Sequence, residues 1–366
     1  MKSRYQEHEP WMRRALDLAR RGEGLTRPNP PVGAVIVNSG RLVAEGYHRT
    51  AGGPHAEMVA LQRAGRRARG STLYVTLEPC CTWGRTPPCT DAILAHGVRE
   101  VVVSVRDPNP VHRGRGLRVL QRHGVEVVSG VCAKEGAELV APFAAWVTTG
   151  RPYVSLKLAV SADGKTADLH GASRWITGPK ARALVHDLRR RADGIMVGAG
   201  TVRRDDPVLL PRPARGRKPW RIVVTRDGNV PSHAKLLNDE GSAQTLVAVS
   251  KSCPRRAIRR LQKKGVDVLK LASSGDGVSL VRLLEHLGRR GLLHVLCEGG
   301  SEVAASLIRA RLVDEFIFCV APCVIGGKQA VGSVGGRGWK LGAQPRLRFV
   351  SVGRAGEDLV IRAKPR

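Results

Sequence analysis

The segment STLYVTLEPCCTWGRTPPCTDAILAHG, residues 71–97, places a strand pattern, three cysteines and a helix pattern in direct succession. Apolar and β-branched residues predict a strand over 71–79, and the pair Pro87-Pro88 suits entry into a helix that begins at Cys89. Cys80 then ends the loop that leaves the strand. The positive end of a helix dipole lowers the pKa of nearby thiols, which favours thiolates as metal ligands. If the backbone is extended here, Cys81 points away from Cys80.

A second segment, PHAEM, completes a candidate metal site. It places His55 at the expected start of a helix and Glu57 two residues later. Catalytic zinc usually has three protein ligands and an open position for water. In zinc deaminases a His-x-Glu sequence is followed by Pro-Cys and a further Cys, and the Glu shuttles a proton without binding the metal. We therefore predict His55, Cys80 and Cys89 as zinc ligands and Glu57 as the proton shuttle, against the alternative of ordinary buried thiols and a helix-capping histidine.

The first half of the chain alternates strands with short helices. Residues 10–21 have helical spacing, and two apolar segments flank a turn at 39–41 as in a β-hairpin. Helices are expected over 55–65, 89–97 and 114–124, and strands over 32–38, 42–48, 71–79, 99–105 and 125–130. This alternation predicts an α/β layer with a largely parallel portion.

A new strand pattern begins after Gly150-Arg151-Pro152, where we place the domain boundary. The predicted domains are residues 1–147 and 151–366. The second half is again α/β, without sequence similarity to the first. Strands are expected over 153–161, 194–200, 221–227, 245–250, 266–271, 293–300 (with its Gly-Gly turn) and 314–322, helices over 179–191, 254–265, 280–291 and 301–312, and mobile loops over 211–219 and 325–339.

The composition favours a soluble, cytoplasmic protein of two domains. A length of 366 residues with 42% hydrophobic content suits two soluble domains, and eight dispersed cysteines are typical of a reducing compartment. No export signal is visible at the N-terminus. The net charge of +30 suggests nucleic-acid binding, but the basic residues are scattered, and a phosphorylated small substrate would also be attracted.

Several motifs together resemble one known family. NPPVGAVIV, EGYH, GGPHAE, TLEPC…GRTPPC and RDPNP…GRG resemble the N-terminal half of the bifunctional pyrimidine deaminase/reductase of riboflavin biosynthesis. LKLAVSADGKTA, SRWIT, GAGTVRRDDP and EGGSEVAASL resemble its C-terminal reductase half, so the resemblance covers nearly the whole chain. It implies a cytidine-deaminase-like α/β/α layer followed by a dihydrofolate-reductase-like α/β domain. It also implies that eight residues between the two ligand cysteines, instead of the usual two, are a feature of this family.

The resemblance also implies substrate and cofactor residues by position. In the first domain the expected contacts to a phosphoribosyl-pyrimidine are Asn29, His48, Arg85, Asp107 and Asn109, for each of which a turn or cap role is an alternative. In the second domain the expected NADPH contacts are Ala159, Thr166, Trp175, Thr201, Asp205 and the run from Gly300 that includes Ser301. The expected substrate contacts there are Ser173, Arg189, Leu209, Arg212 and Glu298.

The second domain lacks a standard dinucleotide fingerprint. VGAGTV is too short, whereas EGGSE follows a strand and opens a helix, where free N–H groups can hold a pyrophosphate or where glycine serves geometry alone. We place Lys157 and Glu298 nearest the ribose carbon that accepts hydride. Arg189 and Arg212 suit the substrate phosphate, and a surface salt bridge is the alternative for either.

The function predicted is therefore hydrolytic deamination of a 2,5-diamino-pyrimidinone ribosylamine 5′-phosphate with zinc, followed by reduction of its ribose with NADPH. The rival is a nucleic-acid base deaminase or RNA-binding protein, which would bind RNA in a salt-sensitive manner and need no second domain. We expect a phosphorylated pyrimidine as the partner, with neither membrane nor nucleic acid. The sequence leaves a homo-oligomer open.

Overall fold

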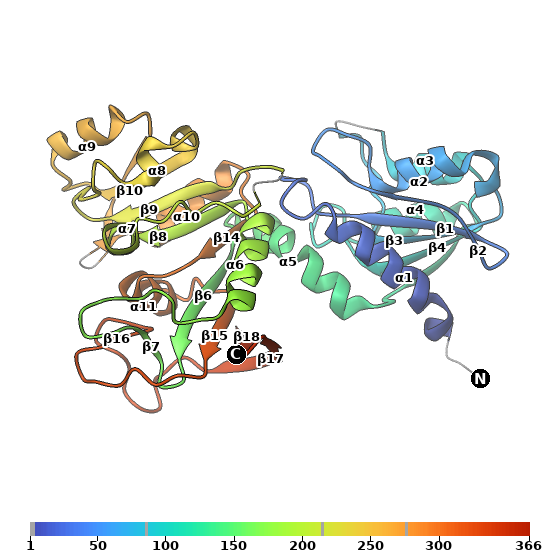
Figure 1. Cartoon of the computed structure of the whole chain (residues 1–366). Coiled ribbons are helices and arrows are strands. Elements are labelled where there is room, and N and C mark those ends of the chain that lie inside the picture. The colour runs from blue at the N-terminus through green and yellow to red at the C-terminus, as the bar shows by residue number, and fades with distance from the viewer. Residues whose placement is uncertain (1–3, 85–86, 214–215, 275–276) are drawn as a thin grey trace. The chain divides into compact units, whose positions relative to one another are not determined.

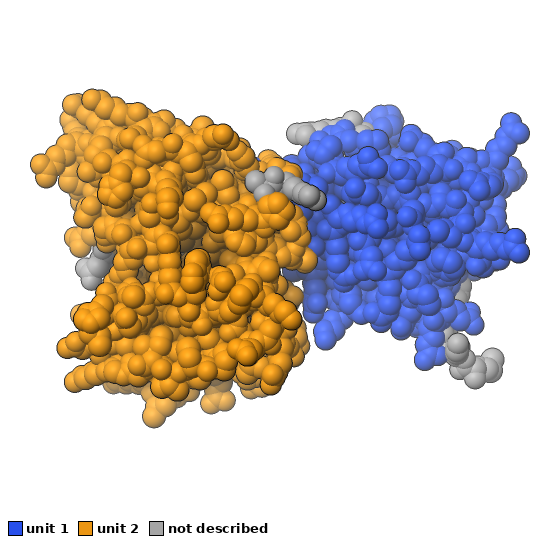
Figure 2. Space-filling model, in the orientation of Figure 1, with its two compact units in different colours: residues 1–150 blue, residues 151–366 orange. Residues whose placement is uncertain are grey.

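The computed structural model describes residues 4–84, 87–213, 216–274 and 277–366 (Figure 1). The chain divides into two compact units, Met1–Gly150 and Arg151–Arg366 (Figure 2). None of the helices in these ranges is long and apolar enough to cross a membrane.

Unit 1 is built on a five-stranded sheet in the order β2-β1-β3-β4-β5. β1 is antiparallel to β2 and to β3, while β3, β4 and β5 are parallel. The strands are β1 (Gly33–Asn38), β2 (Arg41–Tyr47), β3 (Thr72–Leu77), β4 (Glu100–Val105) and β5 (Glu126–Ser129). The helices are α1 (Arg4–Arg20), α2 (Ala56–Ala64), α3 (Cys89–Ala95), α4 (Arg115–Arg122) and α5 (Ala133–Thr149), with a 3-10 turn, η1 (Gly65–Ala68).

Alternating side chains give this sheet two apolar faces. On β1, Ala34 and Ile36 join a core with residues of α2, α3 and α4. Val35 and Val37 join a second core with residues of α1 and α5. The sheet therefore lies between two helical layers, and Figure 1 shows α1 and α2 on its opposite sides.

Unit 2 contains a nine-stranded sheet in the order β11-β10-β9-β8-β14-β6-β15-β18-β17. The strands from β11 to β15 are parallel, and β18 and β17 add an antiparallel hairpin at one edge. Its strands are β6 (Tyr153–Ser161), β8 (Gly194–Gly198), β9 (Trp220–Thr225), β10 (Thr245–Ser250), β11 (Asp267–Leu271), β14 (His294–Cys297), β15 (Glu315–Ala321), β17 (Leu347–Ala355) and β18 (Asp358–Pro365).

Helices cover both faces of this sheet as well. Leu246 and Ala248 of β10 belong to the core that includes α10 and α11, whereas Val247 and Val249 belong to the core that includes α7 and α9. The helices are α6 (Pro179–Arg191), α7 (Ala199–Asp205), α8 (Lys235–Asn238), α9 (Arg255–Gln262), α10 (Leu280–Arg289) and α11 (Ser301–Arg309). The remaining short elements are β7 (Lys165–Ala167), η2 (Ser242–Gln244), β12 (Ser273–Ser274), β13 (Gly277–Val278) and β16 (Val331–Gly332).

Two sequence expectations need correction here. The strand predicted over 194–200 ends at Gly198, because Gly198 is the extended N-cap of α7, which begins at Ala199. The segment 325–339, predicted as a mobile loop, contains β16, which pairs with β7. Helix α5 and the β17–β18 hairpin were not predicted from the sequence.

Candidate active sites

Three potential zinc ligands meet at one end of the unit 1 sheet. His55 is the N-cap of α2, Cys80 follows β3, and Cys89 is the first residue of α3. One nitrogen or sulfur atom from each lies within 4.8 Å of the other two. His55 Nδ1 is 3.2 Å from Cys89 Sγ and 3.6 Å from Cys80 Sγ. One imidazole and two thiols make a set that fits zinc and leaves a fourth tetrahedral position open.

The protonation of this group also suits a metal. The hydrogen bond with Cys89, followed by that with His55, lowers the pKa of Cys80 to about 4 and so favours the thiolate form of Cys80. The Cys89 backbone N–H donates to Cys80 Sγ over 3.3 Å, as expected for a sulfur facing the start of α3. The same thiol–thiolate bond raises the pKa of Cys89, whose proton a bound metal would displace. Cys81 does not belong to the group that the described residues form.

Glu57 lies in the first turn of α2, beside the sulfur atoms. Glu57 is only 4% exposed to solvent. Burial, followed by the charge of Cys80, raises the pKa of its carboxyl group. A buried carboxyl group that readily holds a proton is suited to carry one between water and a leaving group.

Two of the residues predicted to bind the pyrimidine substrate, His48 and Asn29, lie beside the metal ligand His55. The His48 ring lies edge-on to the His55 ring at 5.3 Å between centroids, and its Nε2 is 3.1 Å from Nδ2 of Asn29. Burial lowers the pKa of His48, and its Nδ1 lies 3.0 Å from the Pro54 carbonyl oxygen, so a neutral imidazole can donate there and accept from Asn29.

Asp107 and Asn109 instead fold their own loop. Asp107 Oδ1 accepts the N–H of Asn109 at 2.8 Å, and Asn109 Oδ1 accepts that of Val111 at 3.1 Å. These contacts are the turn role that the sequence left as an alternative. Burial raises the pKa of Asp107. Arg85 lies outside the described residues.

Sequence reasoning missed Glu78, the residue two positions before Cys80. Its carboxylate is buried and accepts hydrogen bonds from three backbone N–H groups, those of Asp107, Gly114 and Gly116. The available signal was an acidic residue directly after a buried strand, but its partners are more than two dozen residues away in sequence and no local pattern identifies them.

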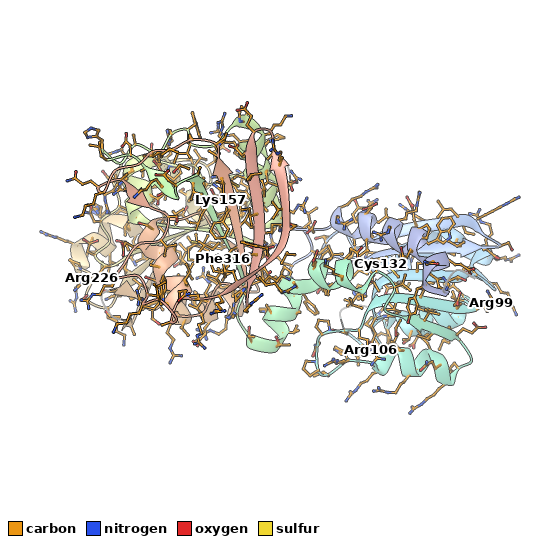
Figure 3. All side chains as sticks on the ribbon, turned by 90° about the horizontal axis from the view of Figure 1, so that it is seen from below. Arg99, Arg106, Cys132, Lys157, Arg226 and Phe316 are labelled. Carbon is orange, nitrogen blue, oxygen red and sulfur yellow. The ribbon has the colours of Figure 1, made fainter. Side chains whose placement is uncertain are left out.

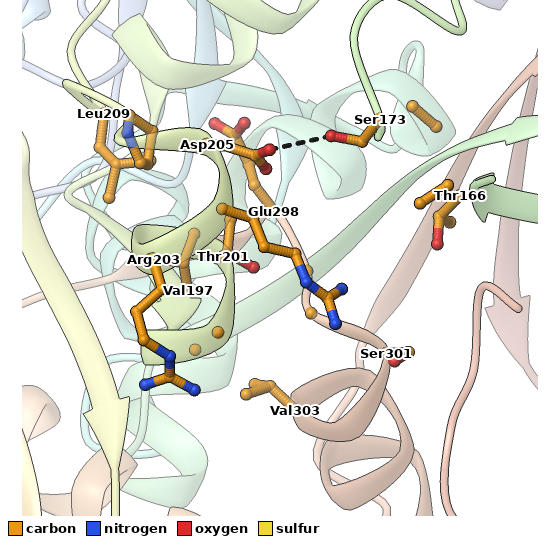
Figure 4. Close-up of a pocket in the computed structure, with 18 of the residues that line it drawn as sticks. Thr166, Ser173, Val197, Thr201, Arg203, Asp205, Leu209, Glu298, Ser301 and Val303 are labelled. Atoms are coloured by element: carbon orange, nitrogen blue, oxygen red, sulfur yellow. Dashed lines mark hydrogen bonds between the residues drawn. The ribbon is translucent and has the colours of Figure 1, made fainter. Parts of the chain in front are cut away.

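Unit 2 contains a cavity of about 1030 Å³ at the carboxyl ends of several parallel strands. Its volume suits a small-molecule or cofactor site. All the residues predicted for the second domain line it, namely Lys157, Ala159, Thr166, Ser173, Trp175, Arg189, Thr201, Asp205, Leu209, Arg212, Glu298, Gly300 and Ser301. Figure 4 shows several of them around the cavity, with Ser301 at the start of α11.

The Gly-Gly turn between β14 and α11 has backbone angles that favour glycine. Gly299 has φ +106° and Gly300 has φ +63°. A Cβ on Gly300 would lie 3.4 Å from Thr201 Oγ1, so the turn runs close to α7. The start of a nine-residue helix therefore faces the cavity, as expected for a pyrophosphate site.

Two charged residues that line this cavity, Arg189 and Glu298, form an ion pair. Glu298 binds Arg189 in a bidentate pair, Nε–Oε1 2.5 Å and Nη2–Oε2 2.8 Å. Burial opposes ionisation of Glu298, but the Arg189 bond and the Lys157 charge outweigh it and lower its pKa. Arg189 Nη1 also donates to the Leu210 carbonyl over 3.2 Å. All three Arg189 guanidinium nitrogens are thus engaged by the protein itself: Nε and Nη2 pair with Glu298, and Nη1 donates to Leu210. The pair is partly buried, unlike the surface salt bridge considered above.

Other residues predicted for the cofactor, the substrate and catalysis also line the cavity. Ser173 Oγ donates to Asp205 Oδ1 at 2.9 Å, the bond drawn in Figure 4. Trp175 is 70% exposed, and the Arg182 guanidinium lies 4.7 Å from its ring centroid. Lys157 stands on β6, next to β15 (Figure 3). An exposed aromatic ring at the rim of a cavity can stack on a flat ligand.

Comparisons with known proteins agree for both units. Residues 5–105 match the family of the cytidine and deoxycytidylate deaminase zinc-binding region, and residues 152–361 match the RibD C-terminal domain. Riboflavin biosynthesis protein RibD of Aquifex aeolicus is 43% identical over 352 residues, covering 96% of both chains. That of Escherichia coli is 39% identical over 369 residues, covering 97% of this chain and 98% of the relative.

Solved structures are similar over the whole length. Form 1 of Acinetobacter baumannii RibD has a TM-score of 0.88 at 36% identity and 99% coverage of both chains. A Thermotoga maritima diaminohydroxyphosphoribosylaminopyrimidine deaminase/5-amino-6-(5-phosphoribosylamino)uracil reductase has a TM-score of 0.87 at 36% identity, again with 99% coverage of both.

Proposed function

We infer the roles of individual residues from the premise that the chain belongs to the RibD family, which its full-length relatives and both domain matches show. The protein is a bifunctional enzyme of riboflavin biosynthesis, with a zinc-dependent deaminase domain of cytidine-deaminase-like fold and an NADPH-dependent reductase domain of dihydrofolate-reductase-like fold. The nucleic-acid alternative is not favoured. We propose residues 1–147 as the deaminase and 151–366 as the reductase.

The deaminase site acts, in this proposal, through His55, Cys80, Cys89 and Glu57. The two sulfurs and the imidazole would hold zinc, which when bound would lower the pKa of a coordinated water. Glu57 takes up the proton of the attacking water and delivers a proton to the departing amine nitrogen, so the products are a ring carbonyl and ammonia. The observation that carries this role is the compact His-Cys-Cys group with a buried carboxyl group beside it.

The substrate of this site is, in our proposal, a 2,5-diamino-pyrimidinone ribosylamine 5′-phosphate. Neutral His48 and Asn29 stand beside the metal ligands, where donors and acceptors can meet the ring edge. Asp107 and Asn109 shape the neighbouring loop. We propose a cytoplasmic location, which the eight free cysteines support.

The reductase site, in this proposal, holds NADPH along the Gly-Gly turn and the walls that carry Thr166, Trp175, Thr201 and Asp205. NADPH supplies the hydride for the ribose carbon. Lys157 and the Arg189–Glu298 pair line the cavity, where an ammonium and a fixed carboxylate can orient the sugar hydroxyls. Arg212 is then the guanidinium for the substrate phosphate, because Arg189 is committed to Glu298.

A coupled assay tests both roles on purified protein. With the diamino substrate alone we expect ammonia release without reduction. Addition of NADPH should then convert the deaminated product to its ribityl form, with consumption of NADPH. Failure to release ammonia would contradict the deaminase role, and deaminated substrate that never consumes NADPH would contradict the reductase role.

A further inference from the structure

The Glu78 carboxylate gathers three backbone N–H groups from one distant segment. Oε2 accepts from the Asp107 N–H at 3.1 Å and from the Gly114 N–H at 2.8 Å. Oε1 accepts from the Gly116 N–H at 2.9 Å. The residue is 5% exposed, so these bonds form away from bulk water. An ionised carboxylate only accepts hydrogen bonds and can receive several at once, which matches three converging donors.

The segment held in this way, residues 107–116, begins and ends on the same side chain. Between the anchors it folds through its own turns, with the Asn109 carbonyl accepting the N–H groups of His112 and Arg113, both at 3.0 Å. Glu78 thus closes a loop that contains Asp107 and Asn109, which the sequence resemblance implies as substrate contacts and which shape the loop beside the site.

Glu78 is also covalently part of the segment that carries the metal ligand Cys80. Cys80 is two positions further on, and the Cys80 carbonyl accepts the Thr90 N–H of α3 at 3.2 Å. The Glu78 backbone N–H donates to the Val105 carbonyl at 3.0 Å, which aligns the ends of β3 and β4. Glu78 therefore stands between the segment that presents a sulfur ligand and the segment that shapes the substrate pocket.

The backbone at Gly116 packs tightly against the backbone of Pro79, next to Glu78. A Cβ added to Gly116 would lie 2.1 Å from the Pro79 carbonyl oxygen and 3.4 Å from Glu78 Oε1. The start of α4 thus lies directly against the Pro79 backbone, with no room for a side chain at Gly116. A small displacement of either segment would break the hydrogen bonds.

We propose that Glu78 is a positioning residue for deamination: it fixes the substrate-binding loop 107–116 in register with the zinc-binding segment that carries Cys80. The inference rests on the proposed deaminase function. Glutamine at this position would turn an NH2 group toward a backbone N–H, because a carboxamide has one acceptor oxygen where the carboxylate has two. The loop would then lose at least one anchor while the sulfur and imidazole ligands remain.

The decisive experiment uses the full-length protein loaded with zinc. For Glu78→Gln we expect a KM for the diamino substrate that rises about tenfold or more, as for a lost bond to a charged group. Zinc should remain at the wild-type stoichiometry, and NADPH-dependent reduction of deaminated substrate should be unchanged. Amide exchange of Asp107, Gly114 and Gly116 should become about tenfold faster or more. Glu78→Asp keeps the acceptor oxygens and should recover part of the loss.

Two further variants separate positioning from general stability. Glu100→Gln alters another buried carboxylate of unit 1, which accepts from Thr72 Oγ1 at 2.9 Å and lies at the start of β4, and its KM should stay at the wild-type value. Gly116→Ala pushes the loop from the Pro79 carbonyl and should raise KM as Glu78→Gln does.

The outcomes distinguish this inference from the function it rests on. Wild-type protein that releases no ammonia would refute the proposed function. Wild-type activity with an unchanged KM and unchanged amide exchange in Glu78→Gln would overturn the inference alone. So would an equal rise of KM in Glu78→Gln and Glu100→Gln, because the effect would then reflect stability in general.

Discussion

Neighbouring side chains around the metal group differ sharply in environment although they are adjacent in sequence. Hydrogen bonds from Cys89 and His55 lower the pKa of Cys80, whereas burial, followed by the charge of Glu78, raises the pKa of Cys81. We therefore expect Cys80→Ser and Cys89→Ser to lose bound zinc, and Cys81→Ser to retain about one zinc per chain. Metal analysis of the purified variants decides it. Loss of zinc in Cys81→Ser with full zinc in Cys80→Ser would reverse the ligand assignment.

Glu57 allows a separate test of proton transfer. Glu57→Gln preserves the shape of a 4%-exposed side chain but removes the group that accepts a proton. We expect zinc content to stay at the wild-type level and ammonia release to fall about 10²- to 10⁴-fold, the usual contribution of general acid–base catalysis. Ammonia release close to wild type would exclude Glu57 as the shuttle.

At the scale of elements, hydrogen bonds hold the segment 325–339 in place, and part of this segment lines the unit 2 cavity. Asp163, in the turn after β6, accepts the N–H groups of Ile325 at 3.1 Å and Gly326 at 2.8 Å. Further along, Thr166 Oγ1 donates to the Val331 carbonyl at 3.3 Å, and Val331 lines the cavity. We expect Asp163→Ala to raise the KM for NADPH several-fold without changing deamination, since it frees one end of this segment. Steady-state kinetics of both reactions measure it, and an unchanged KM would contradict this role.

The pH range of the same anchor follows from its hydrogen bonds. The Ser161 hydroxyl, then the N–H groups of Ile325 and Gly326, lower the pKa of Asp163 to about 2. A pKa lowered by folding gives stability that is present above the unfolded value and is lost as the pH falls through the folded value. The anchor should therefore hold from neutral pH down to about pH 4 and fail near pH 2. Protection of the two amides from hydrogen exchange, corrected for intrinsic rates, should stay constant over the upper range, and a loss already at pH 5 would contradict it.

Elements with strong local signals could be predicted from the sequence, and others could not. Pro179 at the start of α6 and the fully buried run of β10 gave their observed bounds. Helix α7 follows Gly198 within one apolar run, so periodicity did not separate strand from helix. The β17–β18 hairpin exposes Phe349 and Val352, which hides the alternation expected of a half-buried strand.

The candidate sites show the same division. A His-x-Glu and Pro-Cys pattern identified the residues that meet at the metal group, because each ligand lies at the end of a regular element. The roles of Glu78 and Asp163 could not be predicted from the sequence, because each carboxylate accepts hydrogen bonds from backbone N–H groups of segments that are distant in sequence. The Arg189–Glu298 pair spans 109 positions and likewise appears only once β14 and α6 pack together.

On the scale of the whole molecule, each unit has its own sheet and its own pair of apolar cores. The zinc group lies before Gly150, and the cavity that holds Lys157 and Glu298 is formed after it. Deamination and reduction therefore use separate residues, and a substitution in one set should leave the other reaction unchanged.

The last prediction tests this independence with Lys157→Ala and Glu298→Ala. Both variants should release ammonia at the wild-type rate but accumulate the deaminated, unreduced ribosylamino product, even with excess NADPH, with reduction about a hundredfold slower. Because Glu298→Ala leaves the partly buried Arg189 guanidinium without its carboxylate partner, Glu298→Gln, which keeps one acceptor oxygen, serves as a folding control. Chromatography of the reaction mixture identifies the product. Loss of deamination as severe as the loss of reduction in Lys157→Ala would show that the two sites do not act through separate units.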